Sequence, residues 1–175
     1  MGNTLTKVFS ATTDKLEVFQ EVRAYLEGQG FTLTKVDDSR PWGGFFYVSE
    51  TQAEKFISAY FPNLSMDDFK GYNKLSPKIL LVAPQKRLSW QYHHRRSEIW
   101  KVIGGNAGVV VSETEEETPM HQLDIGTEIS LRQGQCHRLI GLKEWGILAE
   151  IWQHTDPENP SDEEDIVRVQ DDFGR

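Results

Sequence analysis

The sequence predicts an all-β domain of short strands, a barrel or a sandwich, with an amphipathic helix before it and a short helical insertion within it. Three observations predict this class. Short apolar runs follow one another at regular intervals from residue 79 onward, with glycine-containing turns between them. Apolar residues recur at helical spacing near the N-terminus. With 38% hydrophobic and 11% aromatic residues, a chain of 175 residues can bury a core, so one compact domain is expected.

The N-terminal helix is predicted over residues 16–26, where apolar side chains return every three or four positions. Thr12 or Thr13 is available as its N-terminal cap, and Gly28 and Gly30 favour its end. A single apolar face indicates that this helix packs against the outside of a sheet rather than against a partner protein.

The chain is predicted to consist of an extension and a main domain. Residues 1–39, the helix and a strand, form the extension and pack on the main domain of residues 40–175. Within the main domain, residues 50–76 look like an insertion. An apolar run at residues 53–61 predicts a second helix there, which ends at Pro62 and could cover the mouth of the barrel.

The strands are predicted where apolar residues alternate or run together between turn residues. Some lie before the insertion and the others follow it. Their predicted bounds are residues 31–36, 44–48, 79–82, 88–92, 99–103, 107–111, 128–131, 138–140 and 147–152.

Composition limits the partners of this protein. The formal charge of −8 argues against nucleic acid and anionic membrane surfaces, because both demand a basic face. An anionic ligand must then meet a local cluster of cations. Cys136 is the only cysteine, so an intramolecular disulfide is excluded. The first residues lack the apolar core of a signal peptide, and no apolar run reaches the roughly 18 residues of a membrane span. We therefore expect a cytoplasmic protein, with a homodimer left open.

Four potential metal ligands lie in short segments of the main domain. Gln91 and His93 are two positions apart, so in a strand they face the same side. Glu98 follows a short polar turn, and a hairpin would place it beside His93. His137 comes after Gly134, which permits a tight turn before another strand. Two imidazoles, a carboxylate and an amide suit one divalent cation, whereas the pair of His93 and Glu98 alone would more simply be a surface ion pair.

These residues resemble the two motifs of the cupin superfamily. The first motif is written G-x5-H-x-H-x4-E-x6-G, and the second is written G-x5-P-x-G-x2-H-x3-N. The matching positions are Gln85, Gln91, His93, Glu98 and Gly105 for the first motif, and Gly126, Arg132, Gly134, His137 and Gly141 for the second. The chain departs from the motifs at Gln85, Gln91, Arg132 and Gly141.

Glutamine at the first ligand position makes the chain similar to the type II phosphomannose isomerases. The resemblance runs from about Arg40 to the end of the chain. Three stretches carry it: the segment from Leu88 to Trp100, Arg40-Pro41-Trp42-Gly43, and the end from Glu164-Asp165-Ile166-Val167-Arg168 to Asp171-Asp172-Phe173-Gly174-Arg175. It implies a cupin double-stranded β-helix, a jelly-roll barrel, and an acidic tail that folds back on the barrel although its composition alone would suggest disorder.

The resemblance also implies a metal-dependent aldose–ketose isomerase that converts mannose 6-phosphate to fructose 6-phosphate through an enediol. Zinc is the first expectation for the ion, and iron, nickel, manganese or cobalt are also compatible with mixed ligands. The implied metal ligands are Gln91, His93, Glu98 and His137.

The catalytic candidates come from the family pattern and from chemistry. Arg96 holds a position that the pattern marks as catalytic, and an arginine suits charge stabilisation of the enediolate better than proton abstraction. His94 and Glu150 are candidates for the proton shuttle, because each can titrate near neutral pH. A solvated turn for His94 and Arg96, and a buried structural partner for Glu150, are the alternatives.

Several cations are candidates for binding the phosphate of a phosphorylated sugar, because their donors suit phosphate oxygens. Lys78 and Arg168 match family positions. The full set of candidates is Lys78, Arg96, Arg138 and Arg168.

Other functions remain compatible with the same residues. A phosphoheptose isomerase would keep the mechanism and change the sugar, and a non-catalytic cupin would bind a sugar without reaction. A metal-dependent dioxygenase is a third class, but it usually needs more histidine ligands, so Gln91 counts against it.

Overall fold

The computed structural model describes residues 2–175, and no helix within that range is long and apolar enough to cross a membrane. The helices are α1 (Lys15–Gly28) and α2 (Ala53–Tyr60), with 3-10 turns at Glu50–Gln52 and Met66–Phe69. The strands are β1 (Leu33–Asp37), β2 (Gly43–Val48), β3 (Lys78–Val82), β4 (Trp90–Tyr92), β5 (Arg96–Gly104), β6 (Ala107–Ser112), β7 (His121–Leu123), β8 (Glu128–Leu131), β9 (Cys136–Gly141), β10 (Gly146–His154) and β11 (Val167–Gln170).

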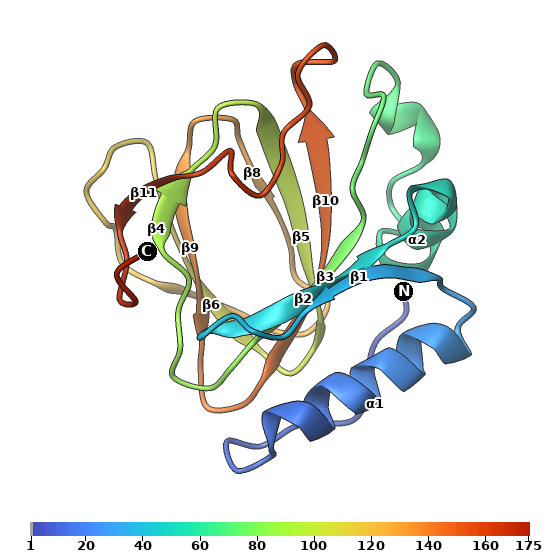
Figure 1. Cartoon of the computed structure of the whole chain (residues 1–175), viewed down its shortest axis with the longest axis vertical. Coiled ribbons are helices and arrows are strands. Elements are labelled where there is room, and N and C mark those ends of the chain that lie inside the picture. Colours follow the sequence, from blue (N-terminus) through green and yellow to red (C-terminus); the bar gives the residue numbers. More distant parts are fainter. Residues whose placement is uncertain (1) are drawn as a thin grey trace.

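The strands form two antiparallel sheets that face each other as a barrel (Figure 1). The six-stranded sheet has the order β1-β2-β3-β10-β5-β8, and the five-stranded sheet has the order β11-β4-β9-β6-β7. Many neighbours are far apart in the sequence, as in a jelly roll, because the chain passes repeatedly from one sheet to the other. The predicted all-β jelly-roll barrel with few helices is confirmed.

Two strands lack the apolar pattern on which the sequence prediction relied. The first two residues of β7 are exposed, and every residue of β11 is at least partly exposed. Each strand exists because it pairs with a neighbour: β7 with β6, and β11 with β4. Edge pairing of this kind leaves little periodicity in a sequence.

The predicted hairpin between the segments of His93 and Glu98 is wrong. β4 ends at Tyr92 in the five-stranded sheet, whereas β5 begins at Arg96 in the six-stranded sheet. Residues 93–95 therefore carry the chain from one sheet to the other. A short polar turn between strands favours a hairpin locally, but here each strand finds its partners elsewhere.

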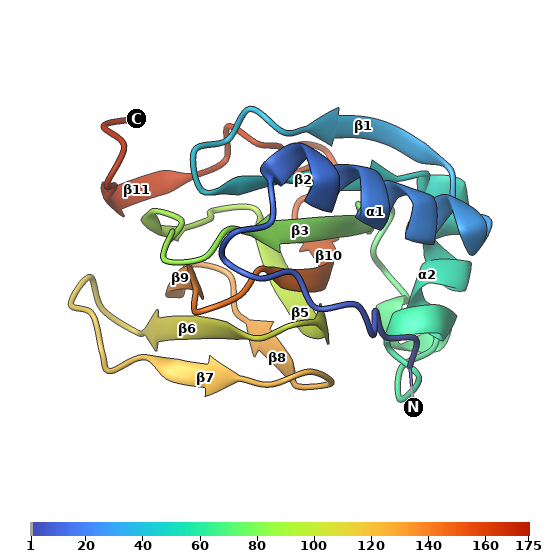
Figure 2. The ribbon, with the colours of Figure 1, turned by 90° about the horizontal axis from the view of Figure 1, so that it is seen from below.

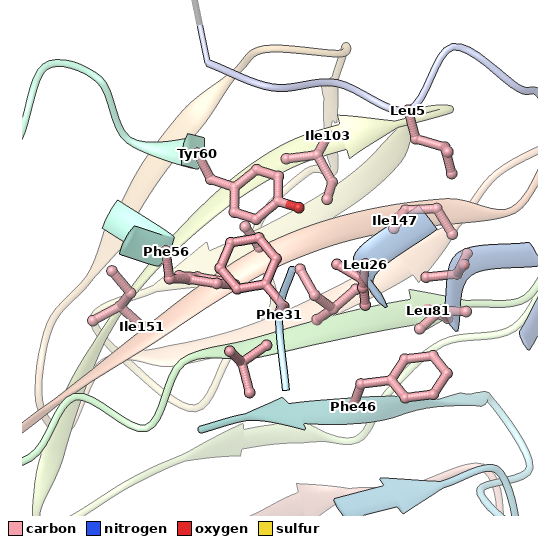
Figure 3. Packing of buried hydrophobic residues seen from close by; sticks show 14 of the residues in the cluster. Leu5, Leu26, Phe31, Phe46, Phe56, Tyr60, Leu81, Ile103, Ile147 and Ile151 are labelled. Carbon is pink, nitrogen blue, oxygen red and sulfur yellow. The ribbon is translucent and has the colours of Figure 1, made fainter. Parts of the chain in front are cut away.

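Apolar side chains pack in two layers. Inside the barrel, Phe45 and Leu148 of the six-stranded sheet meet Leu139 of the facing sheet in one cluster. On the outer side of the six-stranded sheet, Phe46 and Leu81 belong to a second cluster that includes residues of both helices (Figure 3). The alternation of inward and outward side chains along each strand produces the two layers.

Helix α1 lies across the outside of the six-stranded sheet, as predicted (Figure 2). It begins one residue earlier than predicted, and its cap is Asp14, whose side chain accepts a hydrogen bond from Leu16 N at 2.8 Å. Thr12 and Thr13 are not the cap, because their hydroxyls contact Ser10 instead. An aspartate directly before a helix satisfies one of its free backbone N–H groups.

Helix α2 packs in the outer layer and does not cover the mouth of the barrel. Phe56, Ile57 and Tyr60 are buried in the same cluster as the apolar face of α1. The barrel cavity is instead lined by Glu163 and Ile166 of the tail, which we define as residues 155–175. Figure 1 shows the tail crossing from the end of β10 to β11, beside β4. The tail folds back on the barrel as the resemblance implies.

Candidate metal centre

Three buried side chains converge inside the barrel. His93, Glu98 and His137 each offer one ligand atom, and these atoms all lie within 4.8 Å of one another. His93 Nε2 lies 3.2 Å from Glu98 Oε1, and His137 Nε2 lies 3.5 Å from Glu98 Oε2. Ligand atoms about 2.1 Å from one tetrahedral ion are roughly 3.4 Å from each other, so these separations fit a single divalent cation.

The strand register explains how these residues meet. Gln91 of β4 lies opposite His137 of β9 on one side and opposite Arg168 of β11 on the other. Residues directly opposite in an antiparallel pair share a face of the sheet, so these three project together toward the facing sheet. Glu98 projects from β5 in that facing sheet, and the site therefore joins both sheets.

Both histidines are oriented by backbone carbonyl groups. His93 Nδ1 lies 2.6 Å from the carbonyl oxygen of Asp165, and His137 Nδ1 lies 2.9 Å from that of Gln135. A carbonyl oxygen only accepts, so each Nδ1 donates and each Nε2 keeps its lone pair for the cluster. Among residues 2–175, His137 Nε2 and Glu98 Oε2 are buried without a hydrogen-bond partner. A cation would satisfy both atoms, so these residues fit a metal ion.

Gln91 turns its amide oxygen away from the histidines. Its Oε1 accepts a hydrogen bond from Ser89 Oγ at 2.5 Å, and its Nε2 lies 3.4 Å from His93 Nε2. An amide binds a metal ion through its oxygen, so Gln91 becomes a fourth ligand only after the amide turns over. Ser89 can then accept from the amide nitrogen, because a hydroxyl both donates and accepts.

Arg96 lies against the same ligand atoms. Its Nε donates to Glu98 Oε1 at 2.7 Å, and a terminal nitrogen lies 3.1 Å from His93 Nε2. The other terminal nitrogen donates to Ser161 Oγ at 2.8 Å and to the carbonyl oxygen of Asp162 at 2.9 Å. The guanidinium and a divalent cation would both take the lone pair of His93 Nε2. Cation binding therefore requires Arg96 to withdraw from that nitrogen, while its contacts with the tail hold it beside the site.

Burial and the local charges keep His93 and Glu98 in the protonation states in which they can bind a metal ion. Burial is the main reason that the pKa of His93 falls to about 3, and the Arg96 charge acts in the same direction against that of Glu98. Burial alone would raise the pKa of Glu98, but the adjacent Arg96 charge holds that pKa well below its usual range. At neutral pH a neutral His93 thus stands beside an ionised carboxylate.

A second row of side chains lies on the six-stranded sheet. Trp100, Glu150, Lys78 and Tyr47 stand opposite one another on β5, β10, β3 and β2. Trp100 Nε1 donates to Glu150 Oε1 at 2.8 Å, and Lys78 Nζ lies 3.7 Å from Glu150 Oε2. Burial, followed by the charge of Glu98, raises the pKa of Glu150 to about 8, while Lys78 opposes the shift. Glu150 can therefore take up and release a proton near neutral pH.

Lys78 is enclosed by carboxylates and aromatic rings. Its Nζ donates to Glu163 Oε1 at 2.6 Å, and the same oxygen accepts from Tyr47 OH at 2.6 Å. The ammonium nitrogen also lies 4.0 Å from the centre of the Phe45 ring and 4.7 Å from that of Trp152. Lys78 is thus already paired with an acidic residue of the tail.

One cavity connects these groups to solvent. Its volume is about 50 Å³. Glu98 and Glu150 lie in its wall. Arg40, Arg168 and Arg175 also line it and are partly or largely exposed, so these three cations lie toward the mouth.

His94 and Arg138 lie outside the interior of the barrel. His94 is exposed, with its ring against Tyr92. Arg138 is fully buried, but it follows His137 on β9 and faces the other side of that strand, where it donates to Glu117 at 2.8 Å and to Gln170. Of the two shuttle candidates, Glu150 is therefore the one that lies in the cavity.

The structure adds residues that the site prediction did not include. Arg40 and Arg175 lie in stretches that carried the resemblance, so a motif signal existed, but no role had been assigned to them. Asp165 also lies in such a stretch, whereas Glu163 belongs to an acidic segment that looks like solvated tail and holds no periodic signal for a buried role. Only the return of the tail brings them to the barrel.

Solved structures share this fold at low sequence identity. CapF from Staphylococcus aureus, a capsular polysaccharide assembling protein, gives a TM-score of 0.51 at 10% identity over 80% of this chain and 32% of that chain. A structure from a study of the DMSP lyases RdDddP and RnDddQII gives 0.53 at 14% identity over 97% and 73% of the two chains. Vicilin from Solanum lycopersicum (tomato) gives 0.52 at 16% identity over 93% and 36%. This chain thus spans about a third of the CapF and vicilin chains, and the likeness shows the cupin fold alone.

A comparison with protein families is more specific. No curated protein matches the sequence. A family model described as "Mannose-6-phosphate isomerase C-terminal" matches residues 48–171, which is more than half of the chain and includes the metal cluster, Lys78, Glu150 and most of the tail. Because this match covers more than half of the chain and the matched residues form a cupin barrel, this chain belongs to the mannose-6-phosphate isomerase C-terminal family.

Proposed function

We propose that this protein is a metal-dependent aldose–ketose isomerase acting on a sugar phosphate, with mannose 6-phosphate to fructose 6-phosphate as the first candidate reaction. The observation that carries the proposal is the placement of Glu98, a member of the metal cluster, and Glu150 in the wall of one cavity. The family description supports a sugar phosphate, and the CapF title supports sugar chemistry on this fold.

The reaction moves a proton between adjacent carbons through an enediol. Its barrier falls when the sugar oxygens are polarised and a group beside the carbons takes and returns the proton. A divalent cation held by His93, Glu98 and His137, with Gln91 as a further donor, would supply Lewis acidity. Zinc is the first candidate, and iron, nickel, manganese or cobalt suit the same donors.

Glu150 is the residue that we assign to proton transfer. Its burial and the nearby charge of Glu98 raise its pKa to about 8, so it is a stronger base than an exposed carboxylate. The hydrogen bond from Trp100 fixes one carboxylate oxygen, and the other has no hydrogen-bond partner among residues 2–175. That second oxygen is free to take the proton from one substrate carbon and to return it to the next.

Arg96 is the residue that we assign to charge stabilisation. It is buried, and a guanidinium stays protonated throughout the working pH range, so it cannot serve as a base. Once withdrawn from His93, it would still lie between Glu98 and the tail, where its free donors can bind the negative oxygen of an enediolate.

A proton-exchange experiment tests this function. The zinc-loaded protein is incubated with mannose 6-phosphate in deuterated water, and deuterium at C2 is followed by NMR together with fructose 6-phosphate formation. We expect both in the wild type and at least a 100-fold loss in Glu150→Gln, because general acid–base catalysis contributes about that much. The matched control is Glu128→Gln, which makes the same change at an exposed glutamate of β8.

The outcomes distinguish the candidate functions. Turnover of a heptose phosphate alone would keep the mechanism and change the substrate. Binding of the sugar phosphates without exchange would favour a non-catalytic sugar-binding cupin. Absence of exchange with mannose, glucose and heptose phosphates on fully metal-loaded protein would refute the isomerase.

A further inference from the structure

The cations that line the cavity differ in how completely they are already paired. Lys78 donates to Glu163 at 2.6 Å and lies 3.7 Å from Glu150, so two carboxylates balance it. Arg96 is engaged by Glu98 and by the tail. Neither deep cation is therefore a ready partner for a phosphate, because an incoming phosphate would have to displace a buried carboxylate.

The arginines at the mouth have fewer partners. Arg40 Nε pairs with Asp37 Oδ2 at 2.8 Å, and Arg175 pairs with Asp171 Oδ1 at 2.8 Å. Arg168 forms no ion pair with any carboxylate of residues 2–175, and its Nε is buried without a hydrogen-bond partner in that range. A half-buried guanidinium whose Nε has no acceptor is suited to bind an anionic ligand.

The three guanidinium groups share one region. Arg40, Arg168 and Arg175 all line the same cavity. Burial, followed by the charges of Arg175 and then Arg40, lowers the pKa of Arg168, with Asp171 opposing. The like charges are thus close enough to repel one another, and an anion among them would relieve that repulsion.

The fold brings these residues together from two segments, the loop before β2 and the tail. Arg40 lies in the loop before β2, where its carbonyl oxygen accepts a hydrogen bond from Lys15 Nζ of α1 at 2.8 Å. Arg168 lies on β11 opposite Gln91, and Arg175 follows after that strand. Since the two outer arginines are each anchored by an aspartate, their orientation is fixed before any ligand binds, which lowers the entropic cost of binding.

The charge balance of the three arginines indicates how much negative charge a bound anion can carry. Three guanidiniums and two paired aspartates leave a net charge of about one positive unit, on Arg168. A phosphate monoester brings close to two negative charges and three terminal oxygens, which suit one unpaired guanidinium and the free donors of two others.

From these observations we infer that Arg168, flanked by Arg40 and Arg175, forms a subsite for the phosphate monoester at the mouth of the barrel. This inference rests on the proposed sugar-phosphate function and deepens it. The phosphate stays near the solvent side, and the sugar extends inward, with its carbonyl end toward Glu98 and Glu150. The protein thereby selects sugars whose phosphate is at the end of the chain opposite the carbonyl group, and Lys78 serves the reacting end rather than the phosphate.

Binding measured by calorimetry tests the subsite without any turnover. The probes are glucitol 6-phosphate, which has the phosphate but no carbonyl group, and glucitol, which has neither. We expect Arg168→Gln to weaken glucitol 6-phosphate binding about 10- to 100-fold, because a hydrogen-bonded charged partner is removed, and to leave glucitol unaffected. Arg40→Gln should act in the same direction with a smaller effect. Arg132→Gln, an exposed arginine paired with Glu113, is the matched control and should change nothing.

Each result decides the inference. Unchanged glucitol 6-phosphate binding in both Arg168→Gln and Arg40→Gln would overturn it, as would failure of the wild-type protein to bind this probe. A larger loss in Lys78→Met than in Arg168→Gln would move the phosphate to the interior and also overturn it. Melting temperatures of all variants identify any that are unfolded, and Arg168→Lys then replaces Arg168→Gln. Since the probe cannot be isomerised, loss of the isomerase hypothesis leaves this test intact.

Discussion

Arg96 contacts two atoms that a divalent cation would use, namely His93 Nε2 and Glu98 Oε1. Its positive charge therefore opposes a second positive charge at the same place. Two unit charges about 4 Å apart interact by roughly 4 kcal/mol at an effective dielectric constant of 20, so even a fraction of this repulsion is measurable. The same positive charge of Arg96 that would stabilise the enediolate thus also weakens the binding of the metal ion.

The first prediction concerns metal affinity. Arg96→Met should bind zinc at least about tenfold more tightly than the wild type, because about a third of that repulsion corresponds to this factor. The same variant should lose turnover. A competition titration with a chromophoric chelator measures the affinity. Arg96→Lys keeps the charge and should stay near the wild-type affinity, so equal tightening in both variants would contradict the electrostatic explanation.

The second prediction concerns the pH dependence of proton exchange. The pKa of Glu150 lies at about 8, and the Lys78 charge lowers it. Removal of that charge in Lys78→Met must raise the pKa further, so a base that is active when ionised reaches half of its maximal rate at higher pH. The C2 exchange rate from pH 6 to 10 measures this shift. Lys70→Met, at an exposed lysine, should keep the wild-type profile, and a downward shift in Lys78→Met would contradict the assignment of Glu150.

At the scale of elements, the part of the tail before β11 shapes the site although it contributes no strand. The Asp165 carboxylate accepts hydrogen bonds from His94 N and Arg95 N, both at 3.0 Å, and from Ser161 Oγ at 2.6 Å. Its backbone carbonyl orients His93. One residue of the tail therefore fixes both the turn between the sheets and a metal ligand.

The third prediction follows from this arrangement. Asp165→Ala leaves two backbone N–H groups and a hydroxyl without their acceptor, at a cost of about 1–3 kcal/mol. Amide hydrogen exchange should accelerate in residues 161–170, and zinc affinity should fall about tenfold because His93 is less well oriented. Glu164→Ala, at the exposed neighbour, is the control. Unchanged exchange and unchanged affinity in Asp165→Ala would show that the tail does not hold the site.

At the scale of the whole molecule, the metal cluster joins the two sheets. His137 comes from β9 of the five-stranded sheet, Glu98 comes from β5 of the six-stranded sheet, and His93 lies in the crossing turn between them. The ligands are therefore close together only in the folded barrel. Binding to the native state alone stabilises that state by mass action.

The fourth prediction is that zinc stabilises the fold. At a free zinc concentration about 100 times the dissociation constant, the free energy of unfolding should rise by about 2.7 kcal/mol, and a chelator should reverse the change. Urea denaturation with and without zinc measures it. Glu98→Gln should abolish the gain and Glu128→Gln should retain it. A gain of equal size in Glu98→Gln would place the ion elsewhere.

Local information in the sequence was sufficient for the elements that depend on periodicity. The helix at α1, the barrel strands with apolar runs and the spacing of Gln91, His93, Glu98 and His137 are properties of neighbouring residues. The resemblance added the return of the tail. It did not add β7, whose only signal is its pairing with β6.

The sequence by itself determined which side chains alternate into the barrel and which groups suit a divalent cation, because alternation and donor chemistry are properties of a segment on its own. Only the tertiary structure decided that β4 and β5 belong to different sheets, that Arg138 faces away from the cavity, and that Glu163 reaches Lys78. The physical reason is that alternative strand pairings have nearly the same local free energy. They differ in how much apolar surface is buried in the assembled barrel, and this difference selects the observed pairing.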